Sequence, residues 1–244
     1  MKKILFAIAL AVVATACHIN EGDKRVEVGS IAINAATRNE VANTSEEGRF
    51  YLTDVPAVED LSVEIVGNGE VQTWATLAEF NVANEGKRYI SAPYTITLSH
   101  GEMGAEGWSK PCFKGSTTVE VPIYGLTAEA NSEVVLQNAI VIVEATDEFK
   151  GYFPQHSFKV KSFDWEAEKS ELLFLNAGEA TITCEATSQT SKASTFEMTV
   201  TLKPTTRHTV LFDLSTAGNA KVNVTFDGEI VEVVEEEFEL NENA

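Results

Sequence analysis

Apolar and polar residues alternate with a period of two along most of this chain. The clearest runs cover residues 61–65, 94–98, 119–123, 196–202 and 222–226. Successive side chains of a β-strand point to opposite faces, so each run predicts a strand with one buried and one solvated face. One-sided burial of this kind is typical of antiparallel sheets.

Two segments depart from this pattern. Residues 139–145 are apolar at both parities, which predicts a central strand covered on both sides. Residues 70–82 fit a short helix, although Gln72-Thr73-Trp74 also suits a strand, and both alternatives stay open. Glycine- and asparagine-rich turns separate the runs. Among them, Asp227-Gly228 suits a type I′ hairpin turn.

Many short strands between such turns predict an all-β chain built from sandwiches. We expect two tandem β-sandwich domains of the immunoglobulin/transthyretin-like kind, an N-terminal one over residues 24–134 and a C-terminal one over 135–244. The acidic tail that starts at Glu235 continues as a last strand or is a solvated end, and both alternatives remain.

The first residues have the features of an export signal. Lys2 and Lys3 precede an uncharged run from Ile4 to Ala14, which is too short to span a bilayer. Ala14-Thr15-Ala16-Cys17 resembles the lipobox of bacterial lipoproteins, which implies a signal peptide over residues 1–16 and diacylglycerol on Cys17. Residues 17–23 would then be a short lipidated linker, and the protein would be held on a membrane by palmitate-type acyl chains.

The charge balance limits the classes of partner. With 18 basic and 37 acidic residues, the formal net charge is −19. Phosphate-rich partners would be repelled, so we expect no nucleic acid partner. After Cys17 only Cys112 and Cys184 remain, and Cys184 alternates in phase with core positions. A buried free thiol is the favoured interpretation, and a Cys112–Cys184 bridge stays an alternative.

Several segments, in this order and spacing, look like one known family. They are residues 29–33, 92–101 (containing Pro-Tyr-x5-His-Gly), 107–116 (containing Trp-x-x-Pro-x-Phe-x-Gly), 137–141 and 149–153. Together they resemble domain-of-unknown-function family 4493, made of Bacteroidota lipoproteins. The resemblance implies a cell-envelope lipoprotein with β-sandwich modules. It implies no reaction. Glu21 and Asp23, soon after Cys17, also resemble the surface-export signal of Bacteroidota lipoproteins, which favours a position at the outer membrane, exposed on the surface. The architecture is more distantly similar to the fimbrillins, which are pilus subunits.

Catalytic and metal-binding patterns are missing from the sequence. The four histidines have no metal-ligand spacing, and no P-loop, Rossmann glycine pattern or Gly-x-Ser-x-Gly elbow occurs. His100-Gly101 suits a turn better than a catalytic pair, and a hairpin explains Asp227-Gly228-Glu229 more simply than a calcium site does. We therefore expect no enzymatic activity, no cofactor and no metal.

Aromatic residues carry the strongest binding signal. Trp74 and Trp108 are flanked by small and polar residues, and exposed rings of this kind stack on sugars or anchor partners. The alternative is that each ring packs on its own domain. Three functions follow, in descending order: an envelope module that binds or assembles with other envelope proteins, a glycan- or nutrient-binding accessory of an uptake system, and a hydrolase.

Overall fold

The computed structural model describes residues 27–44, 48–166, 171–215 and 221–235. The predictions for the signal peptide, Cys17 and the tail beyond residue 235 lie outside these residues. The elements are β1 (Val28–Thr37), β2 (Glu40–Asn43), β3 (Gly48–Tyr51), η1 (Val58–Asp60), β4 (Ser62–Gly67), β5 (Glu70–Trp74), α1 (Leu77–Ala83), β6 (Tyr89–Ile90), β7 (Pro93–His100), β8 (Gly107–Trp108), β9 (Phe113–Glu120), β10 (Thr127–Leu136), β11 (Ala139–Ala145), α2 (Asp147–Tyr152), β12 (Gln155–Val160), β13 (Phe163–Trp165), β14 (Leu173–Leu175), β15 (Gly178–Thr187), β16 (Ala193–Leu202), β17 (Thr206–Ser215), β18 (Lys221–Phe226) and β19 (Glu229–Glu235).

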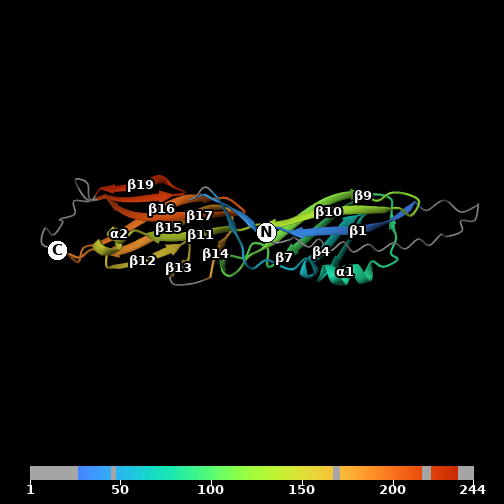
Figure 1. The fold of residues 1–244 in the computed structure, drawn as a ribbon, viewed down its shortest axis with the longest axis horizontal. Helices are drawn as coiled ribbons and strands as arrows, with labels where there is room; N and C mark the ends of the chain where they lie inside the picture. The colour runs from blue at the N-terminus through green and yellow to red at the C-terminus, as the bar shows by residue number, and fades with distance from the viewer. Residues whose placement is uncertain (1–26, 45–47, 167–170, 216–220, 236–244) are drawn as a thin grey trace, which may run out of the picture.

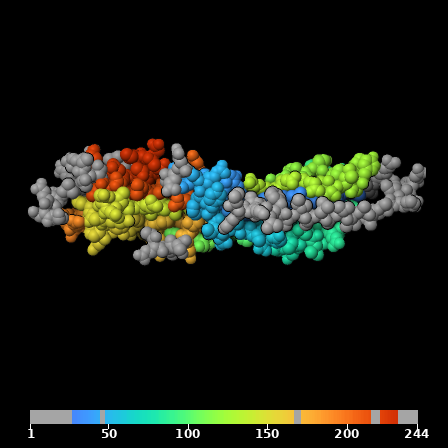
Figure 2. Space-filling view, viewed as in Figure 1, coloured from blue at the N-terminus to red at the C-terminus, as the bar shows by residue number. Residues whose placement is uncertain are grey.

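Two lobes lie end to end and give the molecule an elongated outline (Figures 1 and 2). The first lobe is a seven-stranded sheet in the order β5-β4-β7-β9-β10-β1-β6, in which β1 and β10 run parallel. Helix α1 follows β5, and its Phe80 is fully buried in the lobe's core. Thr76 caps the helix, because its Oγ1 accepts a hydrogen bond from the Glu79 N–H at 3.1 Å.

The second lobe is a β-sandwich. One sheet has the order β19-β18-β17-β11-β14-β8, and the facing sheet has the order β13-β12-β15-β16. Its core joins residues of both sheets, such as Val210 and Phe196, and α2 adds Phe149. The prediction of an all-β chain with two β-domains in series is confirmed, with only two short α-helices among the described residues.

Strand β11 behaves as its two-sided apolar sequence predicted. It lies between β17 and β14, near the middle of its sheet. Ile140 belongs to the core of the first lobe, whereas the adjacent Val141 belongs to the core of the second. Because successive side chains point to opposite faces, this one strand serves both hydrophobic cores.

Three short strands from the N-terminal half of the chain pair in the second lobe's sheet. The β2–β3 hairpin joins β17 through a parallel pairing of Ala42 with Thr206, and β8 joins β14. The chain passes from β10 to β11 at Gln137-Asn138. The division into domains 24–134 and 135–244 stays a prediction, and the lobes share strands across it.

Buried Asn138 links the segments that meet at this passage. Its Oδ1 accepts from the Cys112 N–H at 2.7 Å, and its Nδ2 donates to the Ala105 carbonyl at 3.3 Å. Its own carbonyl accepts from the Thr205 N–H at 2.9 Å. The side chain is fully buried, so these partners replace water.

The structure gives physical reasons for other features noted in the sequence. Residues 70–82 contain both alternatives, with strand β5 followed by helix α1. Asp227 and Gly228 both have positive φ, 54° and 85°, so the predicted hairpin turn is confirmed. The glycine that ends the Trp-x-x-Pro-x-Phe-x-Gly segment, Gly115, lies so close to β10 that a Cβ there would be 2.4 Å from the Glu133 carbonyl oxygen.

Replacing Asn138 by Ala should lower the free energy of unfolding by about 2–4 kcal/mol, because a buried N–H and a buried carbonyl lose their partner. Urea denaturation measures this change. The matched control is Asn131→Ala at an exposed position of β10, where we expect a loss of about 0.5 kcal/mol or less. Equal losses in the two variants would contradict the role given to Asn138.

Candidate functional site

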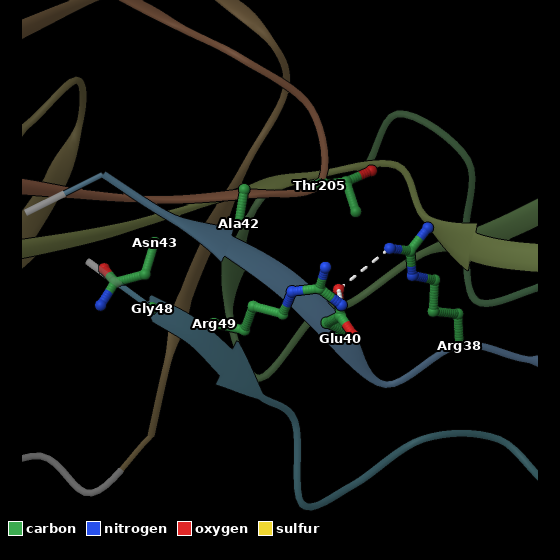
Figure 3. A pocket seen from close by; sticks show the side chains of 7 residues that line it. All are labelled: Arg38, Glu40, Ala42, Asn43, Gly48, Arg49 and Thr205. Carbon is green, nitrogen blue, oxygen red and sulfur yellow. Dashed lines mark hydrogen bonds and ion pairs between the residues drawn. The ribbon is translucent and has the colours of Figure 1, made fainter. Parts of the chain in front are cut away.

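The lobe junction contains a hollow of about 370 Å³. The β2–β3 hairpin forms one wall, and Thr205, just before β17, closes it from the second lobe (Figure 3). Arg38 lies in the link between β1 and β2, and Glu40 opens β2. The hollow therefore lies where the link from β1 enters the β2–β3 hairpin, beside the second lobe.

Glu40 lies between two guanidinium groups in this hollow. Arg38 Nη2 donates to its Oε1 at 3.1 Å, and Arg49 forms an ion pair with the same carboxylate (Figure 3). Hydrogen bonding from Arg49, followed by that from Arg38, holds the pKa of the Glu40 carboxyl below its usual value, against the opposing effect of desolvation. Glu40 is thus ionised at neutral pH and ties β2 to β3, which leaves it unsuited to donate a proton.

A second polar cluster attaches the hairpin to the sandwich. Thr44, which follows β2, donates to Asp227 Oδ1, and the Thr209 N–H donates to the same oxygen at 3.1 Å. Asp227 Oδ2 lies 2.7 Å from Nδ1 of the fully buried His208. Because Nε2 of His208 accepts from the Lys203 N–H at 2.9 Å, Nδ1 carries the proton and donates to Asp227. Both imidazole nitrogens are occupied by structural bonds.

The other histidines and acidic residues form no metal centre that the structure reveals. In the described ranges, no group of three or more His, Cys, Asp or Glu side chains is placed to hold a metal ion. His156, beside a second hollow of about 480 Å³ over β12, β15 and β16, has its Nδ1 2.7 Å from the Phe153 carbonyl. His100 ends β7, and Gly101 follows with a φ of 79°.

Trp74 ends the edge strand β5 and is half-buried. Its ring meets Phe80 edge-on at 5.0 Å, and the Lys87 ammonium lies 5.0 Å from its centroid. Lys87 also lies 5.2 Å from the Tyr89 ring and donates to Gln72. The indole therefore packs edge-on against buried Phe80 and carries the Lys87 ammonium over its ring.

Trp108 forms strand β8 with Gly107 and pairs with β14. Its ring lies 5.2 Å from that of Trp165 and packs against the second core. Trp74 and Trp108 thus lie in different lobes and form no joint site. A ligand at either ring stays a proposal.

Both described cysteines are buried and free. Burial raises the pKa of the Cys184 thiol to about 12 and raises that of Cys112 as well. The bridge alternative is therefore wrong, and the favoured interpretation of buried thiols is confirmed.

Sequence reasoning missed the Arg38–Glu40–Arg49 group. Arg38 and Glu40 are close in sequence, but Arg49 reaches them only because the β2–β3 hairpin brings Arg49 opposite Ala42. An isolated arginine in a short strand carries no signal that a sequence pattern can detect.

Asp227→Asn should lower the free energy of unfolding by about 1–3 kcal/mol. Asparagine tolerates the positive φ of this turn, so the change removes hydrogen-bond acceptance from His208 and the negative charge without straining the backbone. Thermal or urea unfolding measures the loss. The control is Asp164→Asn, an exposed partner of Lys159 at 3.7 Å, for which little change is expected. Equal stability of the Asp227 variant and the native chain would contradict the role given to Asp227 in attaching the hairpin to the sandwich.

Three comparisons place the chain among known proteins. No curated protein matches it in sequence. Similar solved structures include a candidate cell adhesion protein from Bacteroides eggerthii, at 8% identity and a TM-score of 0.39, with 86% of this chain and 98% of that chain covered. A candidate polysaccharide-binding protein from Bacteroides thetaiotaomicron has 8% identity and a TM-score of 0.42, with 86% and 100% covered.

A fimbrial protein from Bacteroides ovatus is also similar, at 9% identity and a TM-score of 0.34, with 78% of this chain and 49% of that chain covered. The sequence profile of the family described as "Domain of unknown function (DUF4493)" matches residues 19–242, which is nearly the whole chain. The protein therefore belongs to the DUF4493 family.

Proposed function

We propose that this protein is a non-enzymatic module of the bacterial cell envelope, anchored by lipid on Cys17 at the outer membrane, that binds or assembles with other envelope proteins. The signal sequence and lipobox support the anchor. No helix within the described ranges is long and apolar enough to cross a membrane. In the assembling form of the proposal, a terminal strand of one subunit completes a sheet of the next.

The observation that carries this proposal is the position of β19. This last described strand lies at the edge of its sheet and pairs with β18 alone. Its Ile230 and Val231 are 62% and 47% exposed, so the apolar start of the strand contributes little to the core. An edge strand whose first residues are weakly buried begins to detach at little cost, and its unpaired edge can pair with another chain.

The strand-exchange form makes a sharp prediction for segment Glu229–Leu240. Thr225 and Ile230 face each other across β18 and β19. In the variant Thr225→Cys/Ile230→Cys, a disulfide would hold β19 in its own sheet. We expect the native chain to form concentration-dependent oligomers and the oxidised variant to stay monomeric, with assembly restored by a reductant. Light scattering after size exclusion measures the mass.

The matched control places the same lock in a hairpin that exchange does not use. Glu64 and Thr73 are opposite and exposed on β4 and β5, so Glu64→Cys/Thr73→Cys should assemble normally in either redox state. A monomeric native chain whose folding is unaffected by deletion of residues 229–240 would exclude strand exchange.

The second candidate function, glycan capture by an uptake accessory, is favoured by the group around Trp74. A half-exposed indole beside Lys87 and Gln72 combines a stacking face with hydrogen-bonding groups, as sugar sites do. Titration with a glycan panel should quench tryptophan fluorescence in the native chain and in Trp108→Phe, but much less in Trp74→Phe. Absence of quenching and of binding across the panel would reject this function.

A further inference from the structure

The loop that joins β9 to β10 is apolar where loops are normally polar. Its sequence is Val121-Pro122-Ile123-Tyr124-Gly125-Leu126. Val121 is buried in the core, but Tyr124 is 74% exposed and Leu126 is 60% exposed. Surface turns usually carry Gly, Asn, Asp and Ser, so large apolar side chains in such a place need a reason.

The backbone of this loop adds an independent observation. Tyr124 has a φ of 64° and Gly125 a φ of 74°. The left-handed region is unfavourable for a bulky side chain and is usually occupied by Gly, Asn or Asp. An aromatic residue that is 74% exposed in this conformation contributes little to the core, which points to a use for the ring outside the lobe.

The loop lies beside the first residue of β1. The Gly125 N–H donates to the Val28 carbonyl at 2.8 Å, and the Ser30 N–H donates to the Leu126 carbonyl at 2.9 Å. On the other side of β1, Ile90 pairs with Val28 and is 49% exposed. Ile90, Tyr124 and Leu126, here named the apolar tip, therefore surround the point where β1 begins. This point is at the end of the first lobe far from α2 (Figure 1).

The position of Cys17 identifies what the apolar tip can reach. About 11 residues separate Cys17 from Val28, so even a fully extended chain spans about 37 Å. If Cys17 carries lipid, as the proposed function holds, this end of the molecule stays near the bilayer surface. The second lobe, with α2 and β12, lies at the opposite end of the molecule (Figure 1).

We propose that the apolar tip inserts into the interfacial region of the lipid bilayer beside the lipid anchor, so that the elongated molecule stands on this end. Tyrosine suits such a position, because its ring is apolar and its hydroxyl reaches the headgroups. Exposed Glu27 and Glu120 lie beside the tip, so the partner is a zwitterionic or neutral surface, and anionic lipid weakens the contact. The inference rests on the proposed anchor and adds the orientation.

The test uses the lipidated chain reconstituted in phosphatidylcholine vesicles. An environment-sensitive fluorophore on Tyr124→Cys should shift to the blue and be quenched by lipids carrying a shallow quencher. The control label, on Thr190→Cys in the β15–β16 hairpin of the second lobe, should stay as in water. Cys112 and Cys184 are buried and leave the labels specific. If the label at residue 124 reports a water-like environment although the protein is bound to the vesicles, the apolar tip does not contact the bilayer. That result would leave the proposed lipid anchor unaffected.

A second measurement separates the tip from the anchor. The chain without residues 1–17 should partition weakly into phosphatidylcholine vesicles. Tyr124→Asn/Leu126→Ser should reduce that partition coefficient about tenfold or more. Asparagine suits the positive φ, so the variant should fold at least as well as the native chain. An unchanged partition coefficient would refute insertion of the apolar tip into the bilayer. If the label at residue 124 shifts to the blue without vesicles, and the shift grows with protein concentration, the apolar tip instead binds a second copy of the chain. Mass spectrometry of Cys17 tests the anchor itself.

Discussion

The structure depends on the buried contact between the two lobes at Asn138. This amide satisfies the Cys112 N–H and the Ala105 carbonyl at the point where the chain leaves the first sheet. The next residues, in β11, then serve both cores from the two faces of one strand. A buried polar group is costly unless it is hydrogen-bonded, so the hydrogen bonds of Asn138 fix how the segments that contain Ala105, Cys112 and Asn138 meet. The lobes are therefore joined by shared strands as well as by the chain passing between them.

The β2–β3 hairpin, which comes from the N-terminal part of the chain, also strengthens this junction between the lobes. It is held to β17 by backbone pairing, to the β18–β19 turn by Thr44 and Asp227, and internally by Glu40 and its arginines. Contacts between segments so far apart along the chain resist bending between the lobes. The proposed orientation on one end and the proposed exchange of β19 at the other would both benefit from such stiffness.

The sequence predicted the features that depend on local patterns. Period-two alternation gave the strands, the two-sided run gave β11, and Asp227-Gly228 gave its hairpin. It did not predict that β2, β3 and β8 pair in the second lobe, because four- and two-residue strands have too few side chains to show which sheet they join. The ion pairs of Glu40 depend on that pairing and were hidden for the same reason. Trp74 and Trp108 were identified as aromatic positions, but only the structure gives their packing against Phe80 and Trp165.

The central proposal is that β19, the last described strand, can leave its own sheet. Hydrogen–deuterium exchange of the monomeric chain tests this most directly, because local opening is measured strand by strand. We predict that amides of β19 exchange at least a hundredfold faster than those of β11 and β17, and become protected when subunits assemble. Protection of β19 equal to that of β11 in the monomer, or no gain of protection on assembly, would contradict the account.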